Sequence, residues 1–468
     1  MRETPKTKII CTIGPASQAP EILEQMIAAG MTVARLNFAH GSFDDHAATI
    51  AAIRSAARAV GRRVAILADL PGPKLRIGSL AEQPVELQRG QRFTLSVGEF
   101  TGDATRASTT FERLPQVVRP GNTIFLNDGL IQLLVDEVRS NDVHCTVAVG
   151  GPLLSQKGIN LPDVDLGISA FTARDRECLE FALSQGVDAV SQSFVQNAED
   201  VTAVREAARA WGGEPMIFAK IERSRALGEI GRILEACDGI MVARGDLGVE
   251  IPIERIAVAQ KELIRKANQR AKPAITATQM LLSMVANRRP TRAEVTDVAN
   301  AILDGTDCVM LSEESAMGAY PVDAVRMLAR IASETEPQVQ PRFHPELRQE
   351  LGKDADDQTL VAASVAHIAE LIEPAGILVP TKTGSTPRKI AAYRLPVWVT
   401  AVSRFEKTCQ ELQFCYGVHA IHQTERPADW QTFARSCFAD AGAGARVLMT
   451  EGTAMGTGGT NRLEIIDL

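Results

Sequence analysis

Charged side chains recur where short β-branched segments of this sequence end. One such segment ends in Lys220-Ile221-Glu222, and the next ends in Arg244-Gly245-Asp246. Because side chains alternate along a strand, Lys220 and Glu222 should lie on the same side of theirs. Two carboxylates beside a lysine suit a hard divalent cation. Such a cation retains some of its bound water molecules and also accepts oxygen ligands from a substrate. We therefore expect Glu222 and Asp246 to bind Mg²⁺, with Mn²⁺ as an alternative.

Polar side chains end other predicted strands as well. Arg35 lies near the end of one, Asp69 ends another, and Thr278 lies near the end of a third. Fixed positive charge on Arg35, Arg76 and Lys220 would suit an anion such as phosphate. The alternative for any single residue is a structural ion pair at a strand end. Five predicted strands end in polar groups, and these groups would lie together at one edge of the fold. This favours a functional site for the set as a whole.

The elements that must position these residues follow the rhythm of a parallel α/β fold. Three strand-like runs precede residue 71 and five follow residue 188, with helical patterns between them. Eight such units predict a TIM (β/α)8 barrel, in which catalytic residues gather at the C-terminal ends of the strands. The predicted strands cover residues 8–14, 33–39, 64–70, 189–195, 216–222, 239–246, 273–280 and 308–313. A capping box at Thr291-Arg292-Ala293-Glu294 predicts the start of the helix between the last two strands.

Two further units interrupt and follow the predicted barrel. Short alternating strands over residues 71–158 predict a small β-barrel lid domain, inserted after the third barrel strand. From residue 341 helices and strands alternate again, and a closed barrel cannot accept more strands. We therefore expect an α/β chain whose three domains are a TIM-barrel catalytic domain, a lid domain and a C-terminal open-sheet α/β regulatory domain. Their predicted bounds are 1–70 with 159–340, 71–158, and 341–468.

Composition limits the classes of function. The 468 residues carry 50 Lys and Arg against 57 Asp and Glu, a net charge of −7, with no basic excess for nucleic acid or an anionic membrane. No apolar run approaches the ~20 residues of a membrane span, and the N-terminus lacks a signal-peptide core. The eight cysteines form no CxxC pair, as expected of reduced thiols. The sequence thus predicts a cytoplasmic protein that binds neither nucleic acid nor a membrane.

A hydroxyl-rich loop stands apart in the predicted C-terminal domain. The residues Thr381-Lys382-Thr383-Gly384-Ser385-Thr386-Pro387 follow a strand and open a helix. A helix N-terminus with backbone and hydroxyl donors suits a phosphate, although a plain turn is the alternative. The glycine-rich residues 452–459 could fold over this loop. The candidate effector ligands are Thr381, Thr383, Ser385 and Thr386.

Seven motifs, in order and over essentially the whole chain, resemble the pyruvate kinase family. The most specific is Met241–Pro252, which reads MVARGDLGVEIP. The others are Thr12–Ser17, Ala34–Phe38, Lys157–Pro162, Lys220–Glu222, Ala277–Leu281 and Arg289–Glu294. The resemblance implies an enzyme of glycolysis that transfers the phosphoryl group of phosphoenolpyruvate to ADP, giving ATP and pyruvate. It also implies a homotetramer that a sugar phosphate could regulate.

The resemblance assigns roles to the polar residues. Lys220 and Arg35 would neutralise charge on the transferred phosphoryl group, and the Gly245 and Asp246 N–H groups would bind the substrate carboxylate. Thr278 would lie near the carbon that is protonated and order a proton-relaying water. The expected nucleotide-side contacts are Asn37, His40, Arg76 and Lys157.

Two other functions remain open at this point. Another Mg²⁺-dependent TIM-barrel enzyme of phosphoenolpyruvate or pyruvate, such as a lyase or an aldolase, could share the metal pair. Such an enzyme gives no reason for a lid that carries Lys157. A catalytically silent sugar-phosphate sensor should have lost Lys220, Glu222, Asp246 or Thr278, and all four are present.

The monovalent-cation site departs from that of potassium-dependent family members, which resemble one another in four oxygen ligands. Asn37 and Asp69 remain here, but Ala39 and Leu70 replace the usual Ser and Thr. Lys74 stands where those members carry Glu, and its ammonium could substitute for the ion beside Asp69. The resemblance therefore implies that potassium is not required.

Two other residues also differ from the family pattern. Arg223 follows Lys-Ile-Glu where the family usually has Asn, and Met317 stands where it usually has Lys. Neither residue is expected to touch the chemistry, so we expect both to affect only local packing or interfaces.

Overall fold

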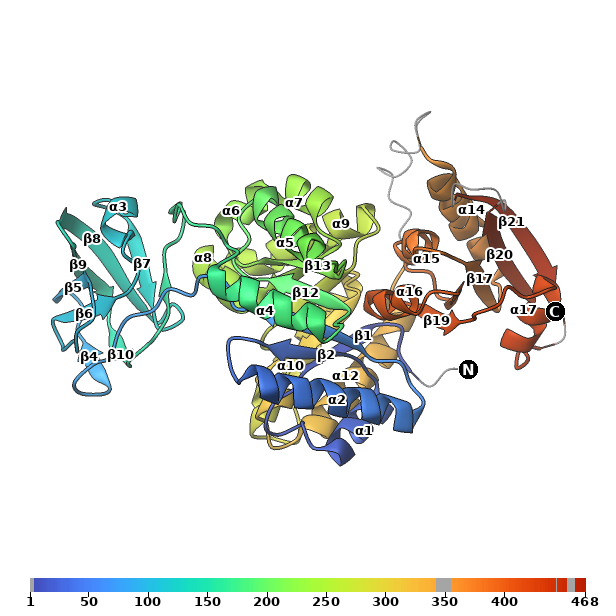
Figure 1. Cartoon of the computed structure of the whole chain (residues 1–468), viewed down its shortest axis with the longest axis horizontal. Coiled ribbons are helices and arrows are strands. Elements are labelled where there is room, and N and C mark those ends of the chain that lie inside the picture. Colours follow the sequence, from blue (N-terminus) through green and yellow to red (C-terminus); the bar gives the residue numbers. More distant parts are fainter. Residues whose placement is uncertain (1–3, 342–354, 443, 453–458) are drawn as a thin grey trace.

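The computed structural model describes residues 4–341, 355–442, 444–452 and 459–468, and eight parallel strands form a closed barrel at its centre (Figure 1). Each strand pairs with its sequence neighbour within the barrel, and β1 closes the ring against β16. The predicted TIM barrel is therefore confirmed. Its strands are β1 (Lys8–Thr12), β2 (Met31–Asn37), β3 (Ala65–Leu70), β12 (Ala189–Gln192), β13 (Met216–Ile221), β14 (Gly239–Ala243), β15 (Ala274–Ala277) and β16 (Cys308–Leu311).

Helices surround the barrel, and local sequence signals start several of them. Capping boxes begin α2 at Ser42, α4 at Thr172, α5 at Asn197 and α10 at Thr291, the last as the sequence predicts. These helices are α1 (Pro20–Ala29), α2 (Phe43–Val60), α4 (Ala173–Ser184), α5 (Ala198–Ala210), α6 (Ser224–Gly228), α7 (Ile230–Ala236), α8 (Arg244–Glu250), α9 (Ile256–Gln269), α10 (Arg292–Leu303), α11 (Glu313–Ala316) and α12 (Pro321–Thr335), with the 3₁₀ turns η1 (Ile253–Arg255), η2 (Leu282–Val285) and η3 (Glu336–Gln338).

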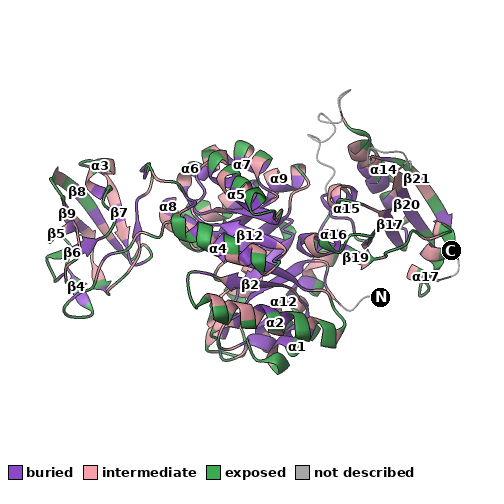
Figure 2. Ribbon diagram, viewed as in Figure 1, coloured by how far each residue is buried: buried purple, intermediate pink, exposed green. Residues whose placement is uncertain are grey.

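Burial on both faces of the strands explains their nearly continuous apolar character (Figure 2). One apolar cluster fills the inside of the barrel and includes Ile10, Leu67 and Phe218. A larger cluster lies between the strands and the surrounding helices and includes Leu23, Ile217 and Leu328. Packing on both sides leaves the strand ends as the places where polar groups reach solvent.

The inserted domain lies at one end of the barrel and has its own apolar core (Figure 1). A six-stranded sheet runs β11-β7-β8-β9-β5-β6, and β10 pairs with β4 beside it. Bridges from Arg76 to Gly158 and from Ile77 to Thr109 connect the two edges of the sheet, so it nearly closes into the small barrel that the sequence predicts. Its elements are β4 (Val85–Leu87), β5 (Arg92–Val97), β6 (Arg106–Thr109), α3 (Leu114–Val117), β7 (Thr123–Leu126), β8 (Ile131–Arg139), β9 (Asp142–Val149), β10 (Gly151–Leu153) and β11 (Ile159–Asn160).

The C-terminal domain is an open five-stranded sheet of order β19-β18-β17-β20-β21, as predicted. Its first four strands are parallel, and β21 adds antiparallel to β20. The elements are α14 (Asp357–Ile372), β17 (Gly376–Pro380), α15 (Ser385–Ala391), β18 (Val399–Ser403), α16 (Glu406–Glu411), η4 (Leu412–Phe414), β19 (Val418–His422), α17 (Trp430–Cys437), β20 (Arg446–Gly452) and β21 (Thr460–Asp467). None of the helices in the described part of the chain is long and apolar enough to cross a bilayer.

The C-terminal domain is anchored on the N-terminal ends of the barrel strands, opposite the inserted domain (Figure 1). Phe414 packs on Phe218 of the barrel interior with ring centroids 4.9 Å apart. The buried Arg394 donates to Asn268 Oδ1 and to Asp307 Oδ2, each at 2.7 Å. Apolar insertion and a satisfied buried arginine together fix this domain on the barrel.

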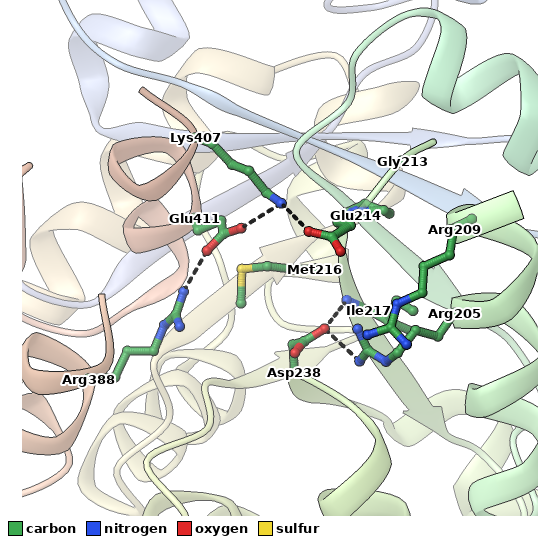
Figure 3. A pocket seen from close by; sticks show the side chains of 12 residues that line it. Arg205, Arg209, Gly213, Glu214, Met216, Ile217, Asp238, Arg388, Lys407 and Glu411 are labelled. Atoms are coloured by element: carbon green, nitrogen blue, oxygen red, sulfur yellow. Dashed lines mark hydrogen bonds and ion pairs between the residues drawn. The ribbon is translucent and has the colours of Figure 1, made fainter. Parts of the chain in front are cut away.

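A cavity of about 210 Å³ lies at the same domain interface (Figure 3). Lys407 reaches Glu411 at 3.9 Å and Glu214 of the barrel at 3.8 Å, and Arg388 binds Glu411 at 2.9 Å. The cavity therefore lies among ion pairs, of which that between Lys407 and Glu214 joins the two domains. It is remote from the C-terminal strand ends where the predicted catalytic residues lie.

Candidate active site

A buried charge network joins three strand ends of the barrel. Asp69, at the end of β3, contacts the Arg35 guanidinium of β2 at 2.5 Å and the Lys220 ammonium of β13 at 3.5 Å. Its other oxygen accepts from Ser191 Oγ at 2.5 Å. Burial acts to raise the pKa of Asp69, but Arg35 and Lys220 outweigh it and hold that pKa below its usual range. Asp69 therefore stays ionised and holds the two cations at the rim.

Lys220 and Glu222 lie on the same side of the chain, as strand alternation predicts. Their charged atoms are 2.9 Å apart. Burial acts to lower the pKa of Lys220, but the charges of Asp69 and Glu222 raise it above its usual value. Lys220 is therefore a permanent cation at this rim, suited to hold phosphoryl or enolate charge.

Glu222 has the electrostatics of a metal ligand. Its pKa is raised, chiefly by burial and further by the Asp246 carboxylate, while Lys220 acts in the opposite direction. Its second oxygen accepts from the backbone N–H of Phe194 at 2.8 Å. Glu222 is buried and Asp246 is half-buried, and a divalent cation bound by both would relieve their repulsion, so the two carboxylates fit Mg²⁺.

Ser193 contacts Lys220 and was not identified from the sequence. Lys220 Nζ donates to Ser193 Oγ at 2.7 Å, and that hydroxyl donates to the Leu70 carbonyl at 2.7 Å. Ser193 directly follows β12, the strand whose polar end we did not include among the candidates. The signal was present, because Ser191 and Ser193 alternate toward the same side of the chain.

Thr278 lies just past its strand in a strained loop. The sequence predicts a strand over residues 273–280, but β15 ends at Ala277, and Thr278 and Gln279 have φ of +68° and +55°. This left-handed conformation is uncommon outside glycine, and the surroundings must enforce it. Thr278 Oγ1 donates to the Ala277 carbonyl at 2.7 Å and accepts from the Gly245 N–H at 2.9 Å.

Arg244 holds that loop in place. Its guanidinium donates to the Thr278 carbonyl at 2.8 Å and pairs with Asp297 at 2.7 Å. Arg244 is also the first residue of α8, whose first turn carries Gly245 and Asp246. A carboxylate that binds the Gly245 N–H must share or replace its contact with Thr278.

The four candidate nucleotide-side residues occupy two places. Arg76 is exposed, with Nη1 donating to the Gln156 carbonyl at 2.8 Å, and Lys157 lies beside it on the opposite hinge strand. Asn37 ends β2 and accepts from the Ala39 N–H at 3.1 Å, and the exposed His40 follows. No hydrogen bond or ion pair joins the two places in the described part of the chain.

Lys74 lies outside the Asp69 network. Its side chain is exposed, and the described residues make no hydrogen bond or ion pair with its ammonium group. The cations at Asp69 are Arg35 and Lys220 instead. The structure thus brings Asp69 together with the two phosphoryl-binding candidates and leaves Lys74 at the entrance to the inserted domain.

Comparison with known proteins decides the family. The model of the family described as "Pyruvate kinase, barrel domain" matches residues 4–325, and that described as "Pyruvate kinase, alpha/beta domain" matches residues 359–466. The chain belongs to the pyruvate kinase family. It is 46% identical to the pyruvate kinase of Thermococcus litoralis over 99% of this chain and 98% of the relative. It is 44% identical to that of Clostridium acetobutylicum, over 89% and 88%, and 42% identical to that of Geobacillus stearothermophilus, over 98% and 80%.

This pyruvate kinase family member has a second cavity, of about 340 Å³, in its C-terminal domain. Three of the four effector candidates line it, namely Thr381, Thr383 and Thr386. Ser385 instead donates to Gln358 Oε1 at 2.8 Å and is not among the lining residues. The predicted covering loop lies largely outside the described residues, although Gly452 and Gly459 at its ends line the cavity.

Basic side chains make this cavity suitable for an anion. Lys382, Arg404 and Arg426 line it together with the three threonines. Thr386 is buried and shares a hydrogen bond of 2.7 Å with Thr460. Glu425 and Glu451 also line the cavity, and Glu451 pairs with Arg426. Lys382 and Arg404, together with the threonine hydroxyls, are the groups that suit a phosphorylated ligand.

Proposed function

We propose that this enzyme transfers the phosphoryl group of phosphoenolpyruvate to ADP, with Mg²⁺ bound by Glu222 and Asp246. The observation that carries the proposal is the Asp69 network, which holds Arg35 and Lys220 at one rim of a barrel from the pyruvate kinase family. When bound, the divalent cation supplies positive charge to the phosphoryl oxygens. Manganese would satisfy the same oxygen ligands.

Phosphoryl transfer needs positioned positive charge more than covalent chemistry from the protein. The bond from phosphorus to the enol oxygen breaks while a bond to a β-phosphate oxygen of ADP forms. Arg35 and Lys220 hold charge that develops on the transferred group and on the enolate oxygen. Asp69 keeps both cations in place, so little reorganisation is needed during the reaction.

The enolpyruvate left behind takes a proton at carbon. Thr278 is held at the rim by Arg244 and by its contact with the Gly245 N–H. An alcohol is a weak acid, so its role is to orient the water that delivers the proton. The backbone N–H groups of Gly245 and Asp246 bind the substrate carboxylate at the start of α8.

Pyruvate formation separates this function from its alternatives. We expect pyruvate to form from phosphoenolpyruvate only when ADP and Mg²⁺ are both present, measured through the NADH consumed by lactate dehydrogenase. A lyase or an aldolase would not require ADP, and a silent sensor would form no pyruvate. Either result would contradict the proposal.

We also propose that the enzyme works in glycolysis, in the cytoplasm, as a homotetramer. The resemblance to its family supports all three statements. Light scattering coupled to gel filtration gives the mass of the assembly directly and tests the tetramer.

The enzyme should not require potassium, because two of the four oxygen ligands are replaced by Ala39 and Leu70. In tetramethylammonium buffer free of potassium and sodium, we expect pyruvate formation near its maximal rate. Lys74→Glu should lower the rate or create a need for potassium, because it reverses charge near the lid entrance. A rise in kcat of about a hundredfold on adding potassium to the wild type would contradict this prediction.

If potassium independence holds but Lys74→Glu behaves as the wild type, Lys74 is not the substitute. The fixed charges of Arg35 and Lys220 at Asp69 would then be sufficient.

A sugar phosphate should bind the 340 Å³ cavity and strengthen phosphoenolpyruvate affinity. A coupling of ~1–3 kcal/mol corresponds to a shift of about 5- to 150-fold in half-saturation. Glucose 6-phosphate and ribose 5-phosphate are suitable probes. Thr383→Glu places a negative charge in the cavity and should abolish the shift, while the exposed Ser436→Glu of α17 should preserve it. If neither probe shifts the wild-type curve, the effector assignment is wrong.

A further inference from the structure

Arg223 lies immediately after the metal-ligand candidate Glu222, between β13 and α6. Its side chain is only 5% exposed, so its charge is held inside the protein. A buried arginine is costly unless its donors are bound and its charge is matched. The partners of Arg223 therefore show which parts of the molecule it holds together.

One nitrogen of Arg223 binds the segment by which the chain returns from the inserted domain to the barrel. Nη2 donates to the carbonyl oxygens of Leu161 and Val164, each at 3.0 Å. This return segment, residues 161–165, directly follows β11, the last strand of the inserted domain. Two charge-assisted hydrogen bonds to its backbone fix the course of the segment, whatever side chains it carries.

The next two residues of the Arg223 loop contact the same segment from its exposed side. Ser224 Oγ donates to Asp163 Oδ1 at 2.9 Å, and Arg225 pairs with Asp165. The side chains of Arg225 and Asp165 are 48% and 63% exposed. An ion pair this exposed contributes little, so the buried Arg223 contact dominates.

The second terminal nitrogen of Arg223 faces α8, while its Nε is buried and has no hydrogen-bond partner among the described residues. Nη1 lies 3.2 Å from Glu250 Oε1 at the C-terminal end of this helix, whose first turn carries Gly245 and Asp246. Burial raises the pKa of Glu250 to about 7, and the charge of Arg223 acts against that rise. A single guanidinium thus contacts the lid's return segment and the helix that carries Asp246, from a position next to Glu222.

We propose that Arg223 is a positioning residue that sets the lid relative to the metal-binding carboxylates. Lys157 lies four residues before Leu161, so the fixed return segment determines where Lys157 meets the nucleotide. The inserted domain touches α8 directly as well, because a Cβ on Gly129 would lie 3.3 Å from the Val249 side chain. The proposal rests on the proposed function and on the expectation that Lys157 of the lid contacts the nucleotide.

This proposed role goes beyond the expectation that Arg223 affects only local packing or interfaces. The family usually carries an asparagine here. Its side chain is too short to contact both the return segment and Glu250 at once, as the planar guanidinium of Arg223 does. The structure therefore gives this chain a connection between lid and barrel that the shorter side chain would not make.

Substitution of Arg223 should change nucleotide use more than phosphoenolpyruvate use. Arg223→Met removes the charge and all donors, so we expect KM for ADP to rise about tenfold or more and kcat to fall. KM for phosphoenolpyruvate should change less than about threefold, because Arg35 and Lys220 keep their partners. Arg223→Lys keeps the positive charge opposite Glu250 but lacks the planar guanidinium with its several donors. Its KM for ADP should lie between those of the wild type and Arg223→Met.

The matched control is Arg225→Met, which removes the exposed pair from the same loop and should change both constants less than about twofold. Hydrogen exchange of residues 158–168, measured on the full chain with Mg²⁺ and phosphoenolpyruvate, gives a readout independent of turnover. We expect faster exchange there in Arg223→Met and not in Arg225→Met. If Arg223→Met does not fold, Arg223→Lys and Arg223→Gln carry the same comparison.

A lower melting temperature with unchanged KM for ADP and unchanged exchange over residues 158–168 would overturn the proposal, because the residue would then be only structural. If the wild type forms no pyruvate, the proposed function fails instead. The exchange difference distinguishes that failure from failure of the Arg223 proposal.

Discussion

Lys220→Met should lower kcat by at least ~10²–10³, the cost of removing a group that stabilises developing charge. The ammonium lies 2.7 Å from Ser193 Oγ, 2.9 Å from Glu222 and 3.5 Å from Asp69, so its position is fixed before substrate arrives. Methionine keeps most of the side-chain volume and removes only the charge and donors. The measurement is kcat at saturating phosphoenolpyruvate, ADP and Mg²⁺, with circular dichroism to verify the fold.

Lys272→Met provides the control for loss of a partly buried lysine. Lys272 donates to the Cys237 carbonyl at 2.6 Å, close to the start of β14 and far from the catalytic rim. We expect this control to lower stability and leave kcat nearly unchanged. A folded Lys220→Met enzyme with kcat within about tenfold of wild type would refute the role of Lys220.

Glu222→Gln should raise the Mg²⁺ concentration needed for half-maximal activity by ~10–100-fold or more. Removal of groups that only contact the metal ligands already lowers metal affinity by about this factor, so removal of a ligand should cost at least as much. Glutamine can still accept the Phe194 N–H that Glu222 accepts at 2.8 Å, so the local backbone keeps its partner. The lost negative charge is what a hard cation needs. Direct binding of Mn²⁺, followed by electron paramagnetic resonance, reports the same loss without turnover.

Glu294→Gln is the matched control for this substitution. Glu294 accepts backbone N–H groups from Ser283 and Thr291 at 2.7 Å each, in the capping box of α10. This change should weaken the helix start and leave Mn²⁺ affinity unchanged. Identical Mn²⁺ titrations for Glu222→Gln and wild type would remove Glu222 from the metal site.

Sequence pattern predicted the architecture well, because periodicity and helix caps are local signals. All eight barrel strands, the Thr291 capping box and the open C-terminal sheet were predicted. Strand ends were predicted too long, as at Thr278, where a contact with Arg244 enforces a left-handed backbone. No local preference of threonine indicates that conformation.

The parts that sequence reasoning missed depend on contacts between distant segments. Three strands of the inserted domain, β6, β10 and β11, are only four, three and two residues long, so their patterns are weak. β10 and β11 also pair with β4 and β7, which are remote in the chain. Arg244 lies in the MVARGDLGVEIP motif and Arg223 directly follows Lys220–Glu222, but their partners Asp297 and Leu161 are 53 and 62 residues away. Ser193 is different, because its alternation with Ser191 was readable and was overlooked.

The central claim is that one phosphoryl group passes from phosphoenolpyruvate to ADP at the rim formed by Arg35, Lys220 and Glu222. Phosphorus NMR of the reaction, with pyruvate measured in parallel, tests it most directly. The account predicts one ATP for every pyruvate, no accumulation of inorganic phosphate, and both products lost together in Lys220→Met. Pyruvate formed with inorganic phosphate in place of ATP, or ATP formation that survives Lys220→Met unchanged, would contradict it.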